Sequence, residues 1–122
     1  MEISVVFSTY NSEEWLEKVI LGFSVQTFRN FEIIIADDGS REATKNLIDK
    51  LRTEIDIPII HVWQEDNGFQ KSQILNKAIL KSTSEYLIFT DGDCIPRNDF
   101  VQNQLKQKEF GFFYPEGILN YQ

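Results

Sequence analysis

Residues 86–93 read Tyr-Leu-Ile-Phe-Thr-Asp-Gly-Asp, an apolar run that ends in two carboxylates separated by one glycine. The run has no alternation of polar and apolar residues, which is typical of a parallel strand covered on both faces. Ligands of open α/β sheets bind beyond the carboxyl ends of such strands. We therefore expect Asp91 and Asp93 to suit Mg²⁺ or Mn²⁺, which take one or two protein carboxylates and leave other positions to water and phosphate. Gly92 is expected to allow a backbone turn that other residues resist.

Three further apolar runs, at residues 3–7, 31–36 and 57–63, share this character. The four runs begin 26 to 29 residues apart, which is the length of a strand plus a crossover helix. Together they predict an α/β fold with a doubly wound, mainly parallel sheet, formed as a single domain over residues 1–122.

The segments between the runs carry apolar residues at helical spacing. The predicted stripes are Trp15, Leu16, Val19, Ile20 and Phe23; Ala43, Leu47, Ile48 and Leu51; and Ile74, Leu75, Ala78 and Ile79. Asn11 with Glu14 resembles a capping box, and Ser40 is a predicted cap of the second helix. Beyond Asp93 we predict a short helix from Asn98 to about Lys108, then a strand over residues 110–114.

Composition excludes several classes of function. The formal charge of −7 disfavours a nucleic-acid binder and offers no polybasic patch for anionic lipid. Cys94 is the single cysteine, so there is no internal disulfide, and no Cys/His cluster suggests zinc. With no leader or membrane span in the sequence, we expect a cytoplasmic protein, with peripheral attachment to the inner face of the membrane as a variant.

Polar residues follow each apolar run, and the fold predicts that they share one edge of the sheet. The four loops are Ser8-Thr9-Tyr10-Asn11, Asp37-Asp38-Gly39-Ser40, residues 64–71 and Asp91-Gly92-Asp93. Loops are polar in most proteins. Carboxylates gathered on one rim repel one another unless a cation compensates, which favours a binding site over a merely solvated edge.

In these motifs the chain resembles family 2 glycosyltransferases of the GT-A fold. The resemblance begins with Val5-Val6-Phe7-Ser8-Thr9-Tyr10-Asn11, Gln26-Thr27-Phe28 and residues 31–40, and continues through Asn67-Gly68-Phe69, Asn76-Lys77-Ala78 and residues 91–96. It covers about residues 3 to 100. The last motifs look closest to bacterial enzymes that build capsular or surface polysaccharides, including chondroitin-polymerase-like transferases.

The resemblance implies transfer of a sugar, with inversion, from a UDP-sugar to a glycan or lipid-linked acceptor. Ser8, Thr9 and Tyr10 would line the base and ribose, and Asp38 would accept a hydrogen bond from uracil N3–H. Asp91 would contact the ribose or the metal shell, and Asp93 would bind Mn²⁺ or Mg²⁺.

The remaining candidate residues are expected to have structural roles, except Lys71, which has two interpretations. Lys71 is either a phosphate contact or a solvated lysine at a helix start, and Asp37 is expected to orient its neighbours rather than touch the ligand. His61 is expected to be a hydrogen-bonded sheet residue, and Cys94 a small buried one with no depressed pKa. The remaining aromatic and polar expectations are Trp15, Phe23 and Phe28 in the core, Trp63 and Phe69 near the rim, and Asn76 in a structural hydrogen bond.

Inverting transfer needs a general base to deprotonate the acceptor hydroxyl. Only Asp99, Glu109 and Glu116 remain as carboxylates after Asp93, and none resembles the family's acceptor-side motif. The catalytic base is therefore unknown, and we expect the acceptor-side portion to be missing from this chain.

Other classes of protein would use parts of the same sequence pattern. A receiver-type phosphoacceptor domain would use Asp37-Asp38 and Asp91, but the acidic pair follows the second run and little chain remains after Asp91. A phosphohydrolase with an aspartate nucleophile usually carries Asp-x-Asp after its first strand. No Gly-x-Gly-x-x-Gly follows the first run, which disfavours an NAD-binding module. A noncatalytic nucleotide-binding fragment is the serious alternative, and it would bind UDP without turnover.

Overall fold

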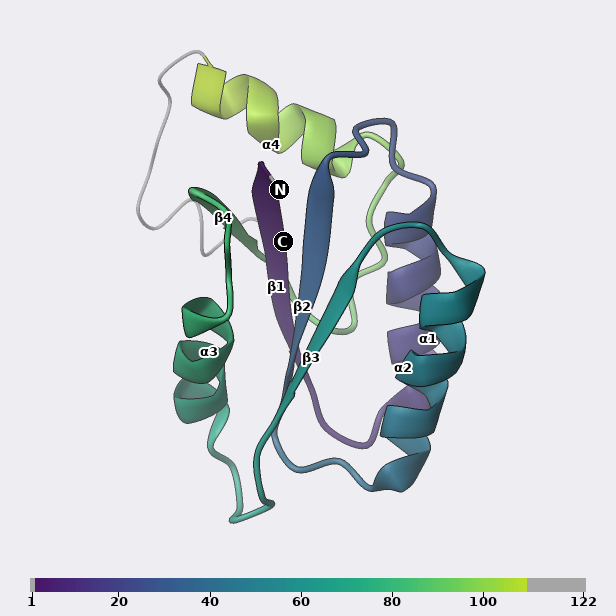
Figure 1. Cartoon of the computed structure of the whole chain (residues 1–122), viewed down its shortest axis with the longest axis vertical. Coiled ribbons are helices and arrows are strands. Elements are labelled where there is room, and N and C mark those ends of the chain that lie inside the picture. Colours follow the sequence, from purple (N-terminus) through teal and green to yellow (C-terminus); the bar gives the residue numbers. More distant parts are fainter. Residues whose placement is uncertain (1, 110–122) are drawn as a thin grey trace.

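The computed structural model describes residues 2–109, in which strands and helices alternate along the chain (Figure 1). The elements are β1 (Ile3–Thr9), α1 (Glu13–Ser24), β2 (Phe31–Asp37), α2 (Glu42–Glu54), β3 (Ile59–Trp63), α3 (Lys71–Leu80), β4 (Tyr86–Phe89) and α4 (Phe100–Glu109). The predicted strand at 110–114, the tail and Glu116 lie outside the described residues. No helix in the described range is both long and apolar enough to cross a membrane.

The strands form one parallel sheet in the order β3-β2-β1-β4. This order confirms the predicted doubly wound α/β fold, because consecutive strands 1 to 3 grow outward in one direction and β4 returns to the other side of β1. The register aligns Thr9 with Asp37, and Asp37 with Trp63. The polar loops that follow β1, β2 and β3 therefore start at one level on the carboxyl edge.

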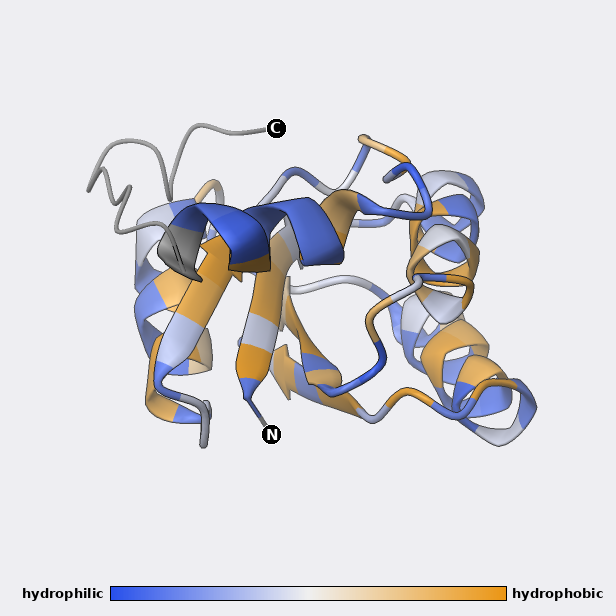
Figure 2. Cartoon of the chain, turned by 90° about the horizontal axis from the view of Figure 1, so that it is seen from above, coloured by the Kyte–Doolittle hydropathy of each residue, from blue (hydrophilic) through white to orange (hydrophobic). Residues whose placement is uncertain are grey.

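Helices cover both faces of the sheet, as the continuous apolar runs required (Figure 1). One face packs against α1, α2 and α4 through a core that includes Val5, Phe7 and Phe23. The other face packs against α3, where Ile74 and Ala78 contact a smaller cluster around Val6. Figure 2 shows the strands as largely hydrophobic ribbon between helices of mixed hydropathy.

The helical stripes are confirmed except at the first members of the stripes in α1 and α2. Trp15 is 45% exposed and Ala43 is exposed, so both predictions of core residues were wrong. In α2 the buried position next to Ala43 is Thr44, whose hydroxyl donates to Glu13 of α1 at 2.5 Å. Periodicity alone missed this site because a hydrogen-bonded threonine can be buried as well as an apolar residue.

Both predicted helix caps were wrong, for one shared reason. The residues at the N-caps are Ser12 and Arg41, and neither makes a side-chain capping bond. Asn11, at a φ of 45°, instead donates its backbone N–H to the Ser40 hydroxyl and accepts from the Arg41 N–H, both at 2.8 Å. The side chains expected to cap two helices thus join the first two loops of the carboxyl edge to each other.

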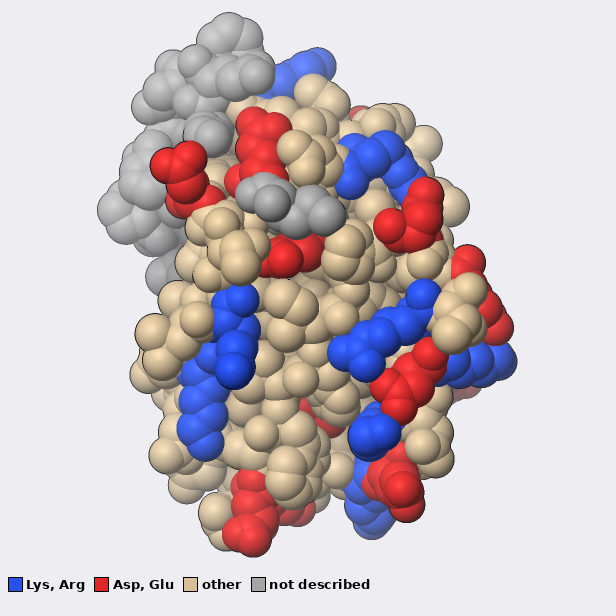
Figure 3. All heavy atoms as spheres, viewed as in Figure 1, with Lys and Arg blue, Asp and Glu red and all other residues tan. Residues whose placement is uncertain are grey.

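The outer surface carries charges of both signs. On the face drawn in Figure 3, basic and acidic side chains are both present and lie beside each other on the right. On α2, Asp49 pairs with both Lys45 and Arg52.

Candidate functional site

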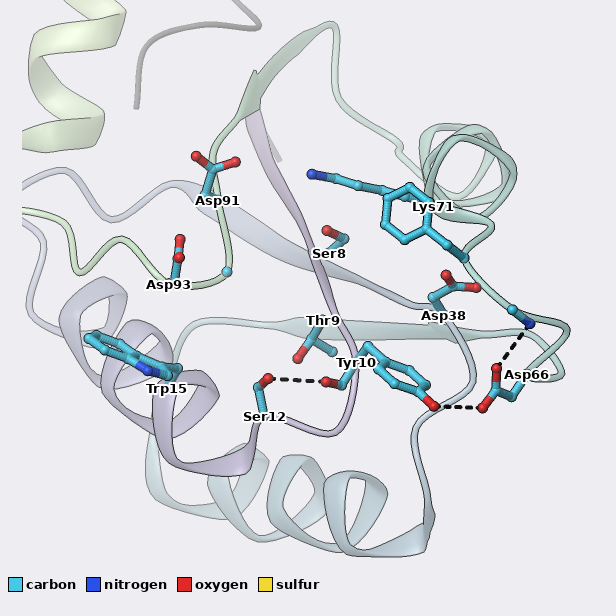
Figure 4. A pocket seen from close by; sticks show the side chains of 13 residues that line it. Ser8, Thr9, Tyr10, Ser12, Trp15, Asp38, Asp66, Lys71, Asp91 and Asp93 are labelled. Carbon is cyan, nitrogen blue, oxygen red and sulfur yellow. Dashed lines mark hydrogen bonds between the residues drawn. The ribbon is translucent and has the colours of Figure 1, made fainter.

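A pocket of about 680 Å³ opens at the carboxyl edge of the sheet (Figure 4). It brings together all the residues expected to bind nucleotide or metal. The lining residues are Ser8, Thr9, Tyr10, Ser12, Trp15, Asp38, Asp66, Gly68, Phe69, Lys71, Asp91, Gly92 and Asp93. Loops that are distant in the sequence therefore meet around one cavity, as the parallel topology predicts.

The Asp91-Gly92-Asp93 turn forms one wall. Oxygens of Asp91 and Asp93 and the sulfur of Cys94 lie within 4.8 Å of one another. The turn is closed by the Cys94 N–H, which donates to the Asp91 carbonyl at 3.3 Å. Asp93 is exposed and Asp91 is half-buried, so both carboxylates are accessible to an ion.

Gly92 is required here, but not for the reason that the sequence suggested. It is not among the glycines with positive φ, which in the described residues are Gly39 and Gly68. A Cβ at Gly92 would instead fall on the carbonyl oxygen of Ser8, well inside the 3.0 Å below which real Cβ contacts are essentially never found. The metal-type turn thus packs directly on the end of β1, which only glycine permits.

The pKa of Cys94 is not depressed, as expected. Its pKa is raised by burial first, and then by the negative charges of Asp93 and Asp91. It is half-buried rather than buried.

Asp38 is held rigidly on the opposite wall. Its side chain is almost fully buried, and its carboxylate accepts from the Gln64 side-chain amide and the Gln70 N–H, both at 2.8 Å. The loop that supplies these donors is pressed against Gly39, where a Cβ would lie 2.5 Å from the Cα of Asp66. The loop after β3 therefore fixes the orientation of an aspartate that follows β2.

Asp37 has the structural role that was predicted for it. It is fully buried and accepts from the Ser40 N–H at 2.9 Å. Its other oxygen lies 2.8 Å from Nε2 of His61. This contact also confirms His61 as a hydrogen-bonded sheet residue; neither residue lines the pocket.

Tyr10 stands at the mouth of the pocket and reaches across to the loop after β3. Its hydroxyl donates to Asp66 at 2.7 Å, while the residue as a whole remains 48% exposed. The Asp66 carboxylate, which accepts this bond and is negatively charged, raises the pKa of the Tyr10 phenol. The bond holds the aromatic ring of Tyr10 between β1 and the loop after β3 (Figure 4).

Electrostatically the pocket is negative. Four aspartates line it against Lys71 as its single cation. Lys71 is the first residue of α3, and its side chain extends across the cavity toward the Asp91 side (Figure 4). Lys71 is half-buried here, and its contact with a ligand stays a prediction.

Several lining residues were missed by sequence reasoning. Trp15 looked like core because it begins an apolar helical stripe, and Ser12 and Asp66 belong to no motif of their own. Phe69, at 86% exposed, lines the pocket as its rim position suggested. The signal for Asp66 would have been its place in the loop that follows a strand.

Other candidates lie elsewhere. Trp63 does not line this pocket, and its indole N–H donates to the Ser40 carbonyl at 3.0 Å. Asn76 is exposed on α3. Asp99 lies beside a second cavity, where it pairs with Arg97. Gln26 belongs to the motif Gln26-Thr27-Phe28, and the structure gives it a role. Its side-chain amide donates to the Arg97 carbonyl at 2.6 Å, which anchors the segment after Asp93 to the end of α1.

Comparison with known proteins extends these observations. The profile of glycosyl transferase family 2 matches residues 4–113. Glycosyltransferase GlyA of Streptococcus pneumoniae is 28% identical over 106 residues, which are 87% of this chain and 15% of that protein. The uncharacterized glycosyltransferase YfnE of Bacillus subtilis is 31% identical over 111 residues, covering 89% of this chain and 27% of that protein. The chain thus spans a minor part of the length of these relatives.

Solved structures show the same fold. The structure of Staphylococcus aureus TarS superposes with a TM-score of 0.76 at 24% identity, covering 91% of this chain and 20% of that one. The mannosyltransferase PcManGT of Pyrobaculum calidifontis gives a TM-score of 0.71 at 23% identity, over 86% of this chain and 31% of that one. With a family match over nearly its whole length and a pocket where the family motifs converge, this chain belongs to glycosyl transferase family 2.

Proposed function

We propose that the chain binds a nucleoside-diphosphate sugar, with uracil as the base, and takes part in inverting transfer of the sugar to a glycan or lipid-linked acceptor. The observation that carries this proposal is the meeting of Asp91 and Asp93 with Asp38 and Tyr10 around one cavity of a family 2 chain. The cavity is large enough for a drug-sized ligand, and its walls come from the switch point of a doubly wound sheet.

The donor set at the Asp91-Gly92-Asp93 turn fits Mn²⁺ or Mg²⁺. Carboxylate oxygens are the ligands that hard divalent cations prefer, and two of them with open solvent on one side leave positions for phosphate oxygens. Without a cation, a diphosphate would enter a pocket with four aspartates and one lysine against strong repulsion. When bound, such a cation neutralises the charge that develops on the diphosphate leaving group.

The two walls of the pocket bind different ends of the donor in this proposal. Asp93 and Asp91 hold the cation and the diphosphate, with Lys71 as a direct phosphate contact. Asp38 accepts from uracil N3–H, since each oxygen of a carboxylate that already accepts one bond has a further lone pair. Ser8 and Thr9 contact the ribose, and the exposed ring of Tyr10 stacks on the base.

Ligands of two fold neighbours support a nucleotide-sugar donor and a divalent cation. TarS was solved with UDP and with UDP-GlcNAc, and PcManGT with GDP-Man and Mn²⁺. Since one neighbour holds a guanine nucleotide, uracil specificity in this chain depends on Asp38 and must be measured. We assign no general base among the described residues, so binding without turnover is the second candidate function.

Calorimetric titration tests the proposal. UDP and GDP are titrated into the full chain with and without Mn²⁺, beside Asp93→Ala and the control Glu65→Ala, which removes one exposed negative charge outside the pocket. We expect UDP to bind in the presence of Mn²⁺. This binding should be lost in Asp93→Ala and retained in the control variant. GDP binding equal to UDP would refute the role of Asp38, and metal-independent binding would refute that of Asp93. Release of UDP from a UDP-sugar in the presence of acceptor would separate an enzyme from a binding module.

A further inference from the structure

We propose that Trp15 is the platform on which the hexose of the donor stacks, an inference that rests on the proposed function. Trp15 lies in the first turn of α1 and lines the pocket with 45% of its surface exposed. Leaving a large apolar ring in water forgoes the favourable free energy of burying it, so a tryptophan on a cavity wall indicates a ligand that covers it.

Trp15 lies at the end of the pocket formed by Asp91 and Asp93, where we place the diphosphate (Figure 4). β3 and β4 are the opposite edges of the sheet, so the loops that follow them lie on opposite sides of the cavity. Tyr10 is bonded to Asp66 on the β3 side. Figure 4 shows Trp15 on the other side, near Asp93.

The packing of α1 agrees with this position. A Cβ at Gly22 of α1 would lie 2.8 Å from the ring of Pro96, and Gln26 holds the Arg97 carbonyl. The helix that carries Trp15 is therefore packed along the segment that continues from Asp93. A donor with its base beside Tyr10 and its diphosphate at Asp93 extends its sugar toward Trp15.

The chemistry of the indole suits a sugar ring. The Lys18 ammonium lies 5.2 Å from the centre of the Trp15 ring, a cation–π contact that uses one face of the indole. Aromatic faces carry negative electrostatic potential, and the C–H groups on one side of a hexose are weakly positive. A stacked hexose thus covers the exposed ring without needing a hydrogen bond from it.

The test compares the affinity for UDP with that for UDP-hexoses. Calorimetry in Mn²⁺ measures UDP, UDP-glucose, UDP-galactose and UDP-N-acetylglucosamine binding to the full chain and to Trp15→Ala, Trp15→Phe and Trp63→Ala. Trp63 is a matched control because it is 53% exposed but does not line the pocket. Circular dichroism checks that each variant is folded.

We expect at least one UDP-hexose to bind the unsubstituted chain more tightly than UDP. Trp15→Ala should reduce that advantage by about two- to tenfold, the range of a single aromatic contact, while leaving UDP binding unchanged. Trp15→Phe should keep most of the affinity advantage of the UDP-hexose over UDP, and Trp63→Ala should leave this advantage unchanged.

The experiment distinguishes failure of the proposed function from failure of the role of Trp15. No binding of UDP to the unsubstituted chain would refute the proposed function and this inference with it. UDP binding with the hexose advantage intact in Trp15→Ala, or absent from the unsubstituted chain, would refute the role of Trp15 alone. Equal loss of UDP and UDP-hexose in Trp15→Ala would also overturn it, because the ring would then support the nucleotide rather than the sugar.

Discussion

Replacement of Gly92 by alanine is expected to disturb the metal end of the pocket and to destabilise the fold. The added Cβ would overlap the Ser8 carbonyl oxygen, and the two would have to separate by about 1 Å to regain an ordinary contact of 3.4 Å. The backbone fixes the positions of both the Cβ and the carbonyl oxygen, so no side-chain rotation relieves the overlap. Overpacking of this kind costs about 1–3 kcal/mol.

The consequences are measurable in two assays. A loss of about 2 kcal/mol should lower the urea midpoint by about 1–2 M if the m-value is about 1–2 kcal/mol per M. The affinity for UDP in Mn²⁺ should fall by about tenfold or more, because the turn that carries Asp91 and Asp93 moves away from β1.

Gly68→Ala is the matched control. Gly68 belongs to the same pocket, but a Cβ there meets no atom within 4 Å, and its φ of +83° alone costs about 1–2 kcal/mol. We expect it to lower the urea midpoint with little effect on UDP affinity. A Gly92→Ala chain with an unchanged urea midpoint would refute the close approach of the two loops, and a displaced midpoint with unchanged UDP affinity would refute its link to the site.

Three further predictions concern single side chains. Asp37→Ala should cost about 1–3 kcal/mol in urea unfolding, because it leaves the half-buried His61 and the Ser40 N–H without their acceptor; a cost below about 0.5 kcal/mol would contradict that network. Asp66→Asn should lower the pKa of the Tyr10 phenol toward its ordinary value, as followed by ultraviolet titration against a Tyr10→Phe reference, and an unchanged pKa would exclude the hydrogen bond. The Cys94 thiol should be alkylated more slowly than a free cysteine at pH 8, since its pKa is raised, and Asp93→Asn should accelerate the reaction; mass spectrometry that showed equal rates would contradict the environment described.

Sequence patterns predicted the elements and the loops of the site well. The four apolar runs became β1 to β4, and every residue expected to bind nucleotide or metal lines one pocket. These predictions succeeded because continuous apolarity specifies a strand buried on both faces, and parallel strands bring their carboxyl ends to one edge.

The errors share a physical origin. Asn11 and Ser40 have the residue types of helix caps, but their strongest available partners lie in each other's loops, 29 residues apart in the sequence. Trp15 fits an apolar stripe, yet the cavity beside it leaves the ring exposed. A local pattern cannot report a partner or a cavity that only the folded chain creates.

The sequence by itself determined the α/β class, the position of each strand and the chemical character of the carboxyl edge, because these depend on period and composition along the chain. Only the tertiary structure decided which partners hold each of these carboxylates in place. Asp37 and Asp38 are adjacent, but β3 supplies His61 to the first, and the loop after β3 supplies its donors to the second. Their roles diverge because each side chain is oriented by hydrogen-bond donors from elements far away in the sequence.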